Sequence, residues 1–503
     1  MDPDAVDIQR LLDQALATRS PDAVVGEILL PAMRSVVAAH ADGEVILPHV
    51  LASAEIVQRA TAYVRPSASA RLGTIVVATL PGDVHHVGKA LLVTILSACG
   101  YSVADLGSQA PVEEIVQAAV DLRPDAIGLS ALLVSTSRQM PVCIQQLDAR
   151  GVQVPVLIGG AAINRAFGRR SGVLPDGRPY EPGVFYCRDV FEGLATLDAL
   201  VDPARRAAQI AKARGEAVAE LGSARRSAAP GPRLTASESA PGGPRGDVTV
   251  PRPPYWGARH FVADLRDVWR DLDRNTLFRY HWGGYRAAPD QFQRLVSDLF
   301  EPQLASLCHA ALVEHWLQAF VVSGYFACNA DGDSLVVYAD DASRSELTRL
   351  NFPRQPDGER LCLADYFRPL ASGERDVVVL QAVTTGPRAG EYIDRLQRSG
   401  DYARMLYVSG LAAATAEALA EYAHNLARRD LALEAGQGLR FSWGYPACPD
   451  LEEQRKVLPL LQAEAHIGLT LSQSCNLDPE HSTAAIILHH AEAKYFAVRG
   501  AAA

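Results

Sequence analysis

The chain has no closely spaced cysteines and no excess of basic charge. Its 8 cysteines are scattered, and no two of them form a Cys-x-x-Cys pair. That pattern is typical of free thiols in a reducing cytosol, and it argues against a disulfide framework or a cysteine zinc site. The formal net charge of −10 argues against a nucleic-acid partner, because proteins that bind nucleic acid normally carry a basic face.

Long apolar runs and a targeting signal are also missing. No run approaches the roughly 20 residues that a membrane helix needs. The N-terminal stretch MDPDAVDIQRLLDQ is acidic and amphipathic, and it lacks the basic start and apolar core of a secretion signal. We therefore expect a cytoplasmic protein with no membrane partner. Its 503 residues are too many for one core, so about two to four domains are expected.

Two regions at the start of the chain differ in their apolar period. In residues 1–68 the apolar residues recur at helical spacing, which predicts four short antiparallel helices. In residues 69–203 short apolar runs such as TIVVATL and VPVLIGG alternate with helical stretches. That alternation is typical of a doubly wound parallel sheet of the flavodoxin or Rossmann-like kind.

The remainder divides into a linker and a last domain. Residues 204–254 contain a stretch rich in Pro, Gly, Ser and Ala without apolar periodicity, which predicts a flexible linker. Residues 255–503 return to a globular composition with mixed helices and strands. The predicted fold class is therefore multidomain, with a helical domain, an α/β domain and an α+β domain.

The stretch PGDVHHVGKA places two histidines and an aspartate directly after the predicted strand TIVVATL. Ligands of doubly wound sheets lie outside the carboxyl ends of the strands. On its own, the pattern DxHxxG still favours an ordinary turn, in which Asp83 caps a helix and Gly88 allows tight packing. Ser130-Ala131-Leu132 and Gly159-Gly160 then follow at the ends of two later predicted strands.

The set DxHxxG, SxL and GG resembles the cobalamin-binding domain of corrinoid methyltransferases, and closely that of cobalamin-dependent methionine synthase. The resemblance implies that His85 is the lower ligand of cobalt, with Asp83 accepting its other ring N–H and Thr136 extending the relay. His86, its neighbour, is expected to point away from cobalt. The slot for the displaced nucleotide tail is expected at Gly88, Ser130, Leu132, Gly159, Gly160 and Ala161.

The helices before the sheet resemble the four-helix cap that covers the methyl face of cobalamin in that family. The resemblance implies that Ile46 shields this face, where relatives often carry an aromatic side chain. A helical segment that merely completes a core has the same pattern. The sequence of residues 1–68 therefore leaves both interpretations open.

A second motif lies near the C-terminus, where RFSWGYPACPD follows the pattern RxxxGYPACP. Alone, it could equally be a Gly/Pro loop around a buried cysteine. Together with LDRNTLF, LAEYAHNLARR and AKYFAV in the same order, it resembles the S-adenosylmethionine-binding activation domain of methionine synthase.

This second resemblance implies a site for S-adenosylmethionine. Arg440 is expected to hold its carboxylate, since a guanidinium suits a planar carboxylate. Glu417 and Asp273 are candidates for its amino and ribose groups, although Glu417 could also be a solvated helix residue. The remaining expected contacts are Gly444, Tyr445, Ala447 and Tyr495.

These resemblances together imply a methyltransferase component. The chain shows no homocysteine or folate module, so we expect the methyl-carrier and reactivation subunit of a split methionine synthase. It would cycle between cob(I)alamin and methylcobalamin, and would remethylate cob(II)alamin with S-adenosylmethionine. The expected partners are separate homocysteine and methyltetrahydrofolate methyltransferases and a flavodoxin-like electron donor. The alternatives are a corrinoid protein of another methyltransferase system and a cobalamin sensor or trafficking protein.

Overall fold

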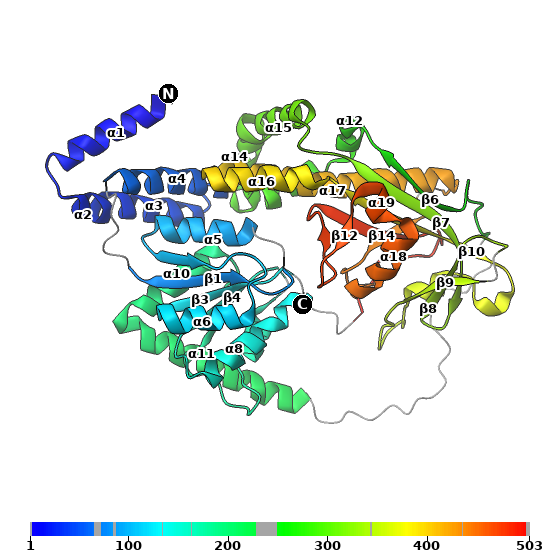
Figure 1. Cartoon of the computed structure of the whole chain (residues 1–503), viewed down its shortest axis with the longest axis horizontal. Coiled ribbons are helices and arrows are strands. Elements are labelled where there is room, and N and C mark those ends of the chain that lie inside the picture. The colour runs from blue at the N-terminus through cyan, green and yellow to red at the C-terminus, as the bar shows by residue number, and fades with distance from the viewer. Residues whose placement is uncertain are drawn as a thin grey trace.

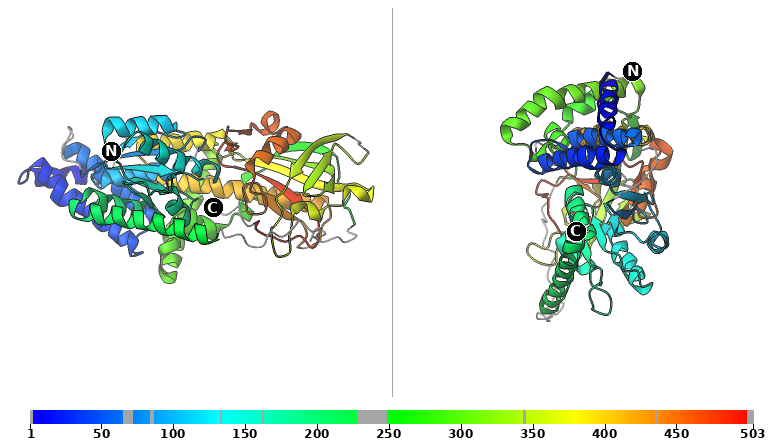
Figure 2. Two further views of the ribbon diagram at one scale, coloured as in Figure 1. Left: turned by 90° about the horizontal axis from the view of Figure 1, so that it is seen from below. Right: turned by 90° about the vertical axis from the view of Figure 1, so that its left-hand side faces the viewer.

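The computed structural model describes residues 3–64, 72–83, 87–132, 134–161, 163–227, 249–342, 345–434 and 436–498. It contains a helical part (3–64), a parallel-sheet part (72–227) and an antiparallel-sheet part (249–498). Figures 1 and 2 show the helical part at one end of an elongated molecule and the antiparallel sheet at the other. The predicted fold class is confirmed.

Four helices form the helical part, as the spacing of its apolar residues predicts. They are α1 (Pro3–Leu16), α2 (Pro21–Val24), α3 (Leu30–Ala41) and α4 (Leu47–Val64). A π-helical turn at Val25–Leu29 joins α2 and α3 into one continuous helix. By length and composition alone that joined helix could cross a membrane, but core helices of globular proteins meet the same test, and α3 packs against α4.

The parallel-sheet part has five strands in the order β2-β1-β3-β4-β5, all of them parallel. The strands are β1 (Thr74–Thr79), β2 (Ser102–Asp105), β3 (Ala126–Ser130), β4 (Val156–Gly159) and β5 (Val184–Tyr186). Helices α5 (Val87–Ala98) and α10 (Val190–Val201) cover one face, and α6 (Val112–Leu122) and α8 (Gln139–Ala149) cover the other. The three central strands β1, β3 and β4 are almost fully buried and nearly continuously apolar, as expected of a parallel sheet, whereas the edge strands β2 and β5 are only partly buried.

The segment expected to be a linker is helical in its first half. Helix α11 (Pro203–Ser227) packs against α10 and α9 (Arg165–Ser171). Alanine, arginine and glutamate dominate its sequence and favour a helix, and Glu216 pairs with Arg169 across to α9. The expectation of a flexible linker is wrong for these residues. Residues 228–248 lie outside the described part of the chain, and 249–254 have no regular structure.

A seven-stranded sheet is the centre of the antiparallel-sheet part. Its order is β11-β14-β10-β7-β8-β9, and β6 pairs with β7. The strands are β6 (Gly257–Val262), β7 (Phe320–Asp331), β8 (Ser334–Tyr338), β9 (Glu346–Asn351), β10 (Asp376–Thr384), β11 (Leu439–Ser442) and β14 (Ser482–Leu488). The long helix α17 (Tyr402–Asp430) packs on β10 and β14, and α16 (Pro387–Ser399) precedes it.

One apolar core connects all three parts. It includes Met33 and Leu51 from the helical part, Leu96 from α5, and Trp282 and Leu411 from the antiparallel-sheet part. Helix α4 packs against both α5 and α17, and Figure 1 shows α4 nearly in line with the start of α16 and α17. The three parts are therefore packed as one body in this arrangement.

Candidate functional site

Asp83, directly after β1, is the buried centre of a small polar network. Its side chain is fully buried, and Oδ2 accepts hydrogen bonds from the Leu132 amide at 2.6 Å and the Thr136 hydroxyl at 3.0 Å. Thr136 is also buried and lies in the short helix α7 (Val134–Ser137) after β3. The structure thus joins Asp83 and Thr136 from two strand ends, as expected. His85 and His86 lie outside the described residues.

Removing the Asp83 carboxylate is expected to destabilise this edge of the sheet. Hydrogen bonds to a charged acceptor contribute about 1.5–3 kcal/mol each, and a buried donor left without a partner is costly. We expect Asp83→Ala to lower the free energy of unfolding by about 2–4 kcal/mol. Thr136→Val, which removes only one donor, should cost clearly less. Urea unfolding of both variants measures the difference, and equal losses would contradict this network.

A cavity of about 220 Å³ lies between the sheet and helices α5 and α10. Four of the expected slot residues line it: Gly88, Ser130, Gly159 and Gly160. Leu132 instead contributes its amide to Asp83 and has a 40% exposed side chain. Ala161 is exposed and is not in the lining.

Two glycines of this cavity have different structural reasons. Gly88 has nothing within 4 Å of the place where a Cβ would stand, so the wall of the cavity is open there. Gly160 has a φ of +126°, and a Cβ on it would lie 2.7 Å from the carbonyl carbon of Ala131 and closer still to its oxygen. Gly160 is therefore required by its contact with Ala131, whereas the open wall at Gly88 leaves room for the tail of a cobalamin, which a side chain there would narrow.

Lys89 is a cavity residue that the motif analysis did not single out. Its side chain is 3% exposed, lines the cavity, and pairs with Asp105 at the end of β2. A buried lysine is rare unless it is paired, so this ion pair accounts for its burial. In the sequence, only its position directly after Gly88 indicates that Lys89 lies at the cavity.

Ile46 is buried in the protein core, so its side chain offers no open surface to the Asp83 edge of the sheet. It is 2% exposed and belongs to the apolar core that the three parts share. The edge is faced instead by the antiparallel-sheet part, where the Asn476 side-chain amide donates to the Gly82 carbonyl at 2.6 Å. That Ile46 shields a cofactor face stays a prediction.

A second polar cluster surrounds Arg440 on β11. The Arg440 side chain is 15% exposed, and its Nη2 lies 3.2 Å from Glu417 Oε2 on α17. Its Nη1 donates to the Ser442 hydroxyl at 3.5 Å, and Glu421 lies 3.9 Å from its Nε. The structure therefore brings the two expected residues Arg440 and Glu417 together from elements far apart in the chain.

The motif GYPAC forms a tight turn beside Arg440. The Gly444 amide donates to the Cys448 carbonyl at 2.9 Å, and Gly444 has a φ of +88°. Ala447 is buried, whereas the Tyr445 side chain is 57% exposed, with its pKa raised first by the charge of Glu417. Tyr495 is 67% exposed, and its ring packs 5.1 Å from that of Phe441 on β11. Tyr445 thus lies within reach of the charges of Glu417 and Arg440, whereas Tyr495 packs on Phe441, whose side chain points to the opposite face of β11 from Arg440.

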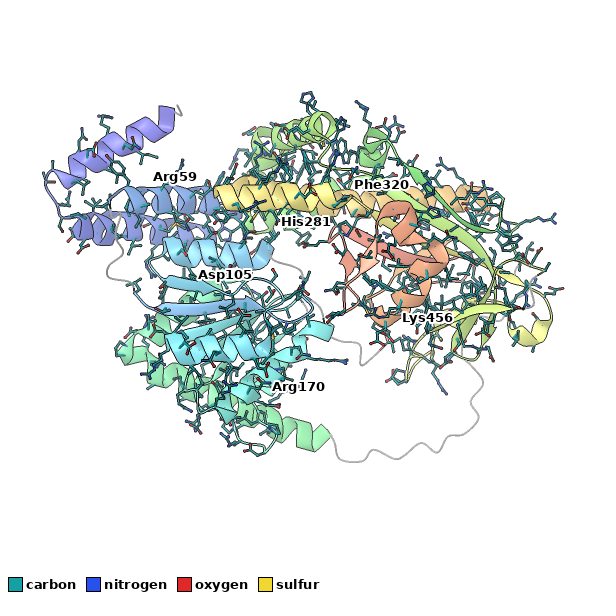
Figure 3. All side chains as sticks on the ribbon, in the orientation of Figure 1. Arg59, Asp105, Arg170, His281, Phe320 and Lys456 are labelled. Atoms are coloured by element: carbon teal, nitrogen blue, oxygen red, sulfur yellow. The ribbon has the colours of Figure 1, made fainter. Side chains whose placement is uncertain are left out.

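Asp273 and His281 complete this cluster. Asp273 caps the short helix α13 (Arg274–Thr276) by accepting from the Thr276 amide at 3.0 Å. His281 ends the π-helical turn η3 (Leu277–His281) that follows, and Figure 3 shows it beside α17. Burial lowers the pKa of His281, while the charges of Glu417 and Asp273 oppose this shift. No sequence motif includes His281, because its neighbours come from distant parts of the chain.

The charge of Glu417 is expected to be visible in the titration of His281. Since the Glu417 carboxylate favours the protonated ring, Glu417→Gln should lower the pKa of His281 further. Because the native pKa is already below the ordinary value, His281 opposes folding once the pH falls through about 6.5. NMR titration of the labelled histidine ring measures the shift. If the pKa of His281 is unchanged in Glu417→Gln, the charge of Glu417 does not act on the His281 ring.

Comparison with known families identifies the class of these domains. The family of the vitamin B12 dependent methionine synthase activation domain matches residues 290–502, and two B12 binding domain families match residues 73–172 and 1–65. The chain is thus a cobalamin-binding protein with an activation domain. These matches confirm the expected cofactors, cobalamin and S-adenosylmethionine, at the level of domain type.

Two curated relatives match nearly the whole chain. The methionine synthases of Mycobacterium tuberculosis and Mycobacterium leprae are 34% and 35% identical to the chain, over 97% of its residues and 44% of their own. The chain thus combines B12 binding domains with a methionine synthase activation domain, and it corresponds to the C-terminal half of these two methionine synthases. It spans less than half the length of these relatives.

Two solved structures are also similar. The MetH reactivation domain bound to AdoHcy is 27% identical and covers 50% of this chain and 83% of its own, with a TM-score of 0.45. The methanol:cobalamin methyltransferase complex MtaBC of Methanosarcina barkeri is 24% identical and covers 41% and 78%, with a TM-score of 0.37.

Proposed function

We propose that this chain carries methyl groups on bound cobalamin and restores the inactive cofactor with a methyl group from S-adenosylmethionine. One contact supports the proposal above the others. The Asn476 side chain of the antiparallel-sheet part donates to the Gly82 carbonyl, one residue before Asp83. A Cβ on Gly82 would lie 2.6 Å from the Ser474 Cβ, so only a glycine allows this approach.

At the cobalamin site, the proposed roles follow from the polar network. His85 would ligate cobalt, and Asp83 would accept its ring N–H and fix its orientation. The Thr136 hydroxyl donates to the Asp83 carboxylate. The cavity behind Gly88 would receive the nucleotide tail. When bound, cobalamin supplies a cobalt centre that accepts a methyl group and passes it to a thiolate.

At the second site, the side chains suit the polar end of S-adenosylmethionine. Arg440 would bind the carboxylate with its planar guanidinium. Glu417 and Arg440 now pair with each other, and on binding each would turn to the amino and carboxylate groups of the ligand. Asp273 would bind the ribose, and Tyr445 and Tyr495 would cover the ligand with their exposed rings. Remethylation takes one electron from an external flavodoxin-like donor and one methyl group from S-adenosylmethionine, which leaves as S-adenosylhomocysteine.

We further propose that the methyl donor and acceptor are handled by separate homocysteine and methyltetrahydrofolate methyltransferases. The support is that the matched domains are cobalamin-binding and activation domains, which carry a methyl group and need a donor and an acceptor for it. Adding separately purified homocysteine and folate methyltransferase modules to the loaded chain should then give methionine. If no methionine forms with these modules, the chain would instead serve another methyltransferase system.

The proposed function is tested first on the protein alone. The chain is loaded with cobalamin, reduced to cob(II)alamin, and given S-adenosylmethionine with a low-potential reductant. We expect the absorption spectrum of protein-bound methylcobalamin to appear, and to be lost in Arg440→Ala. Binding of cobalamin without methylation would overturn the reactivation role and favour a sensor or trafficking protein. No binding of cobalamin would overturn the carrier role as well.

A further inference from the structure

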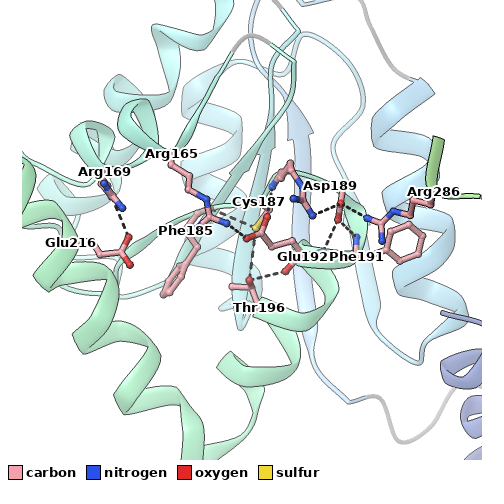
Figure 4. Close-up of polar contacts among 11 residues, drawn as sticks. Arg165, Arg169, Phe185, Cys187, Asp189, Phe191, Glu192, Thr196, Glu216 and Arg286 are labelled. Atoms are coloured by element: carbon pink, nitrogen blue, oxygen red, sulfur yellow. Dashed lines mark hydrogen bonds and ion pairs between the residues drawn. The ribbon is translucent and has the colours of Figure 1, made fainter. Parts of the chain in front are cut away.

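Arg286 is the residue at which all three parts of the molecule meet. It ends the short 3-10 helix η4 (Gly284–Arg286) of the antiparallel-sheet part. Its Nη2 lies 3.0 Å from Asp189 Oδ2 of the parallel-sheet part, and its Nη1 lies 3.5 Å from the Ala41 carbonyl of the helical part. The Tyr285 hydroxyl, 2.9 Å from Nε, holds the third edge of the guanidinium. Figure 4 shows the Arg286–Asp189 contact.

Asp189 joins this contact to the cofactor cavity. Its Oδ1 caps α10 by accepting from the amides of Phe191 at 3.1 Å and Glu192 at 2.9 Å. The same residue lines the cavity of Gly88 and Gly160. Its second oxygen, Oδ2, accepts from Arg286 at 3.0 Å and from the exposed side chain of Arg188 at 3.4 Å, so both contacts form without loss of the cap. The arginine of one domain thus holds the wall of a cavity in another.

The surroundings of Arg286 fit the helical part closely. A Cβ on Gly43 would lie 2.8 Å from the Arg286 carbonyl oxygen, and one on Gly283 would lie 3.0 Å from the Leu47 Cβ. The Gln291 side chain donates to the Glu44 carbonyl at 2.9 Å. The side chains of Arg286 and Asp189 are 20% and 22% exposed, so solvent screens their attraction only in part.

We infer that Arg286 is a positioning residue for remethylation, which fixes the antiparallel-sheet part against the cobalamin cavity through Asp189 and against the helical part through Ala41. The inference rests on the proposed function of the two sites. Arg286 lies outside both the Asp83 network and the Arg440 cluster, so it acts through the relative placement of the domains. Apolar contacts can be made in several registers, whereas a guanidinium bound to one oxygen in each of two other domains selects one.

A double-mutant cycle tests this inference. Arg286→Gln removes the charge, and Asp189→Asn removes the partner charge while an amide oxygen still caps α10, since Asn caps as well as Asp. Hydrogen exchange of the full chain without cofactor reports docking through peptides that cover residues 40–46 and 283–291. We expect each single variant to raise exchange there about threefold to tenfold, and the double variant to add little. Arg266→Gln, an exposed arginine of the same domain, should change nothing.

The second measurement is the rate of methyl transfer from S-adenosylmethionine into bound cobalamin. Arg286→Gln and Asp189→Asn should lower this rate by a similar factor, with unchanged affinity for S-adenosylmethionine. Added salt should slow the wild type and have a smaller effect on the variants. Additive effects of the two substitutions, or normal hydrogen exchange in both single variants, would overturn the role of Arg286.

If the wild type shows no methylation, the proposed function fails, and the hydrogen-exchange cycle still decides whether Arg286 holds the domains together. If Arg286→Gln does not fold, Arg286→Lys, which keeps the charge but loses the planar fork, takes its place in the cycle.

Discussion

Replacing Arg440 with alanine is expected to raise the dissociation constant for S-adenosylmethionine about 10- to 100-fold. A hydrogen bond to a charged group contributes about 1.5–3 kcal/mol, and each 1.4 kcal/mol is a tenfold change in affinity. The 15% exposure of the Arg440 side chain means that water cannot fully replace it. The loss also leaves the carboxylate of Glu417 without its cation. Isothermal titration of the cobalamin-free chain with S-adenosylmethionine measures the effect.

Two further variants serve as controls for the Arg440→Ala measurement. Arg440→Lys keeps the charge but loses the planar fork, so it should fall between the wild type and alanine. Arg398→Gln removes an exposed arginine on α16, and it should bind as the wild type does. If wild type and Arg440→Ala bound S-adenosylmethionine with equal affinity, the ligand would not bind at this cluster. The same would follow if Arg398→Gln, and not Arg440→Ala, weakened the binding of S-adenosylmethionine.

The sequence predicted which residues form the two sites better than it predicted how the three domains pack around them. Asp83, Ser130 and Gly159 each follow or end a strand, and parallel strands bring their carboxyl ends to one edge. The positions of these strand ends could therefore be predicted from the local pattern, whereas the meeting of Asp83 and Thr136 was predicted from the family resemblance. Arg440 and Glu417 were predicted from the family resemblance, since nothing in their spacing shows that β11 packs beside α17.

Other features depend on contacts between distant segments. His281, Lys89 and Arg286 have no motif of their own, and their importance appears only when the chain is folded. Helix α11 was missed because the segment was judged as a whole. Its alanine- and arginine-rich first half forms a helix, whereas the Pro- and Gly-rich half that follows gave the segment its average composition. The burial of Ile46 depends on how the three parts pack, which no local pattern encodes.

Replacing Gly160 with alanine is expected to lower the free energy of unfolding of the parallel-sheet part by about 3–5 kcal/mol. The new Cβ would overlap the Ala131 peptide, and a φ of +126° is strained for any side chain. The Ala131 peptide cannot move aside easily, because its amide donates to the Gly159 carbonyl at 3.1 Å. Thermal unfolding of the cofactor-free chain measures the loss, and a stable Gly160→Ala variant would contradict this packing.

Gly88→Ala, in the wall of the same cavity, should have the opposite effect on stability. Its Cβ would meet nothing within 4 Å, and alanine in place of a helical glycine stabilises by about 0.5–1 kcal/mol. If the tail of cobalamin fills the cavity, that Cβ takes up space which the ligand needs, so the affinity for cobalamin should fall while stability is kept or gained. Titration with cobalamin, followed by absorbance, separates the two effects. Undiminished affinity in Gly88→Ala would mean that the tail lies elsewhere, because a side chain placed in its path would otherwise be felt.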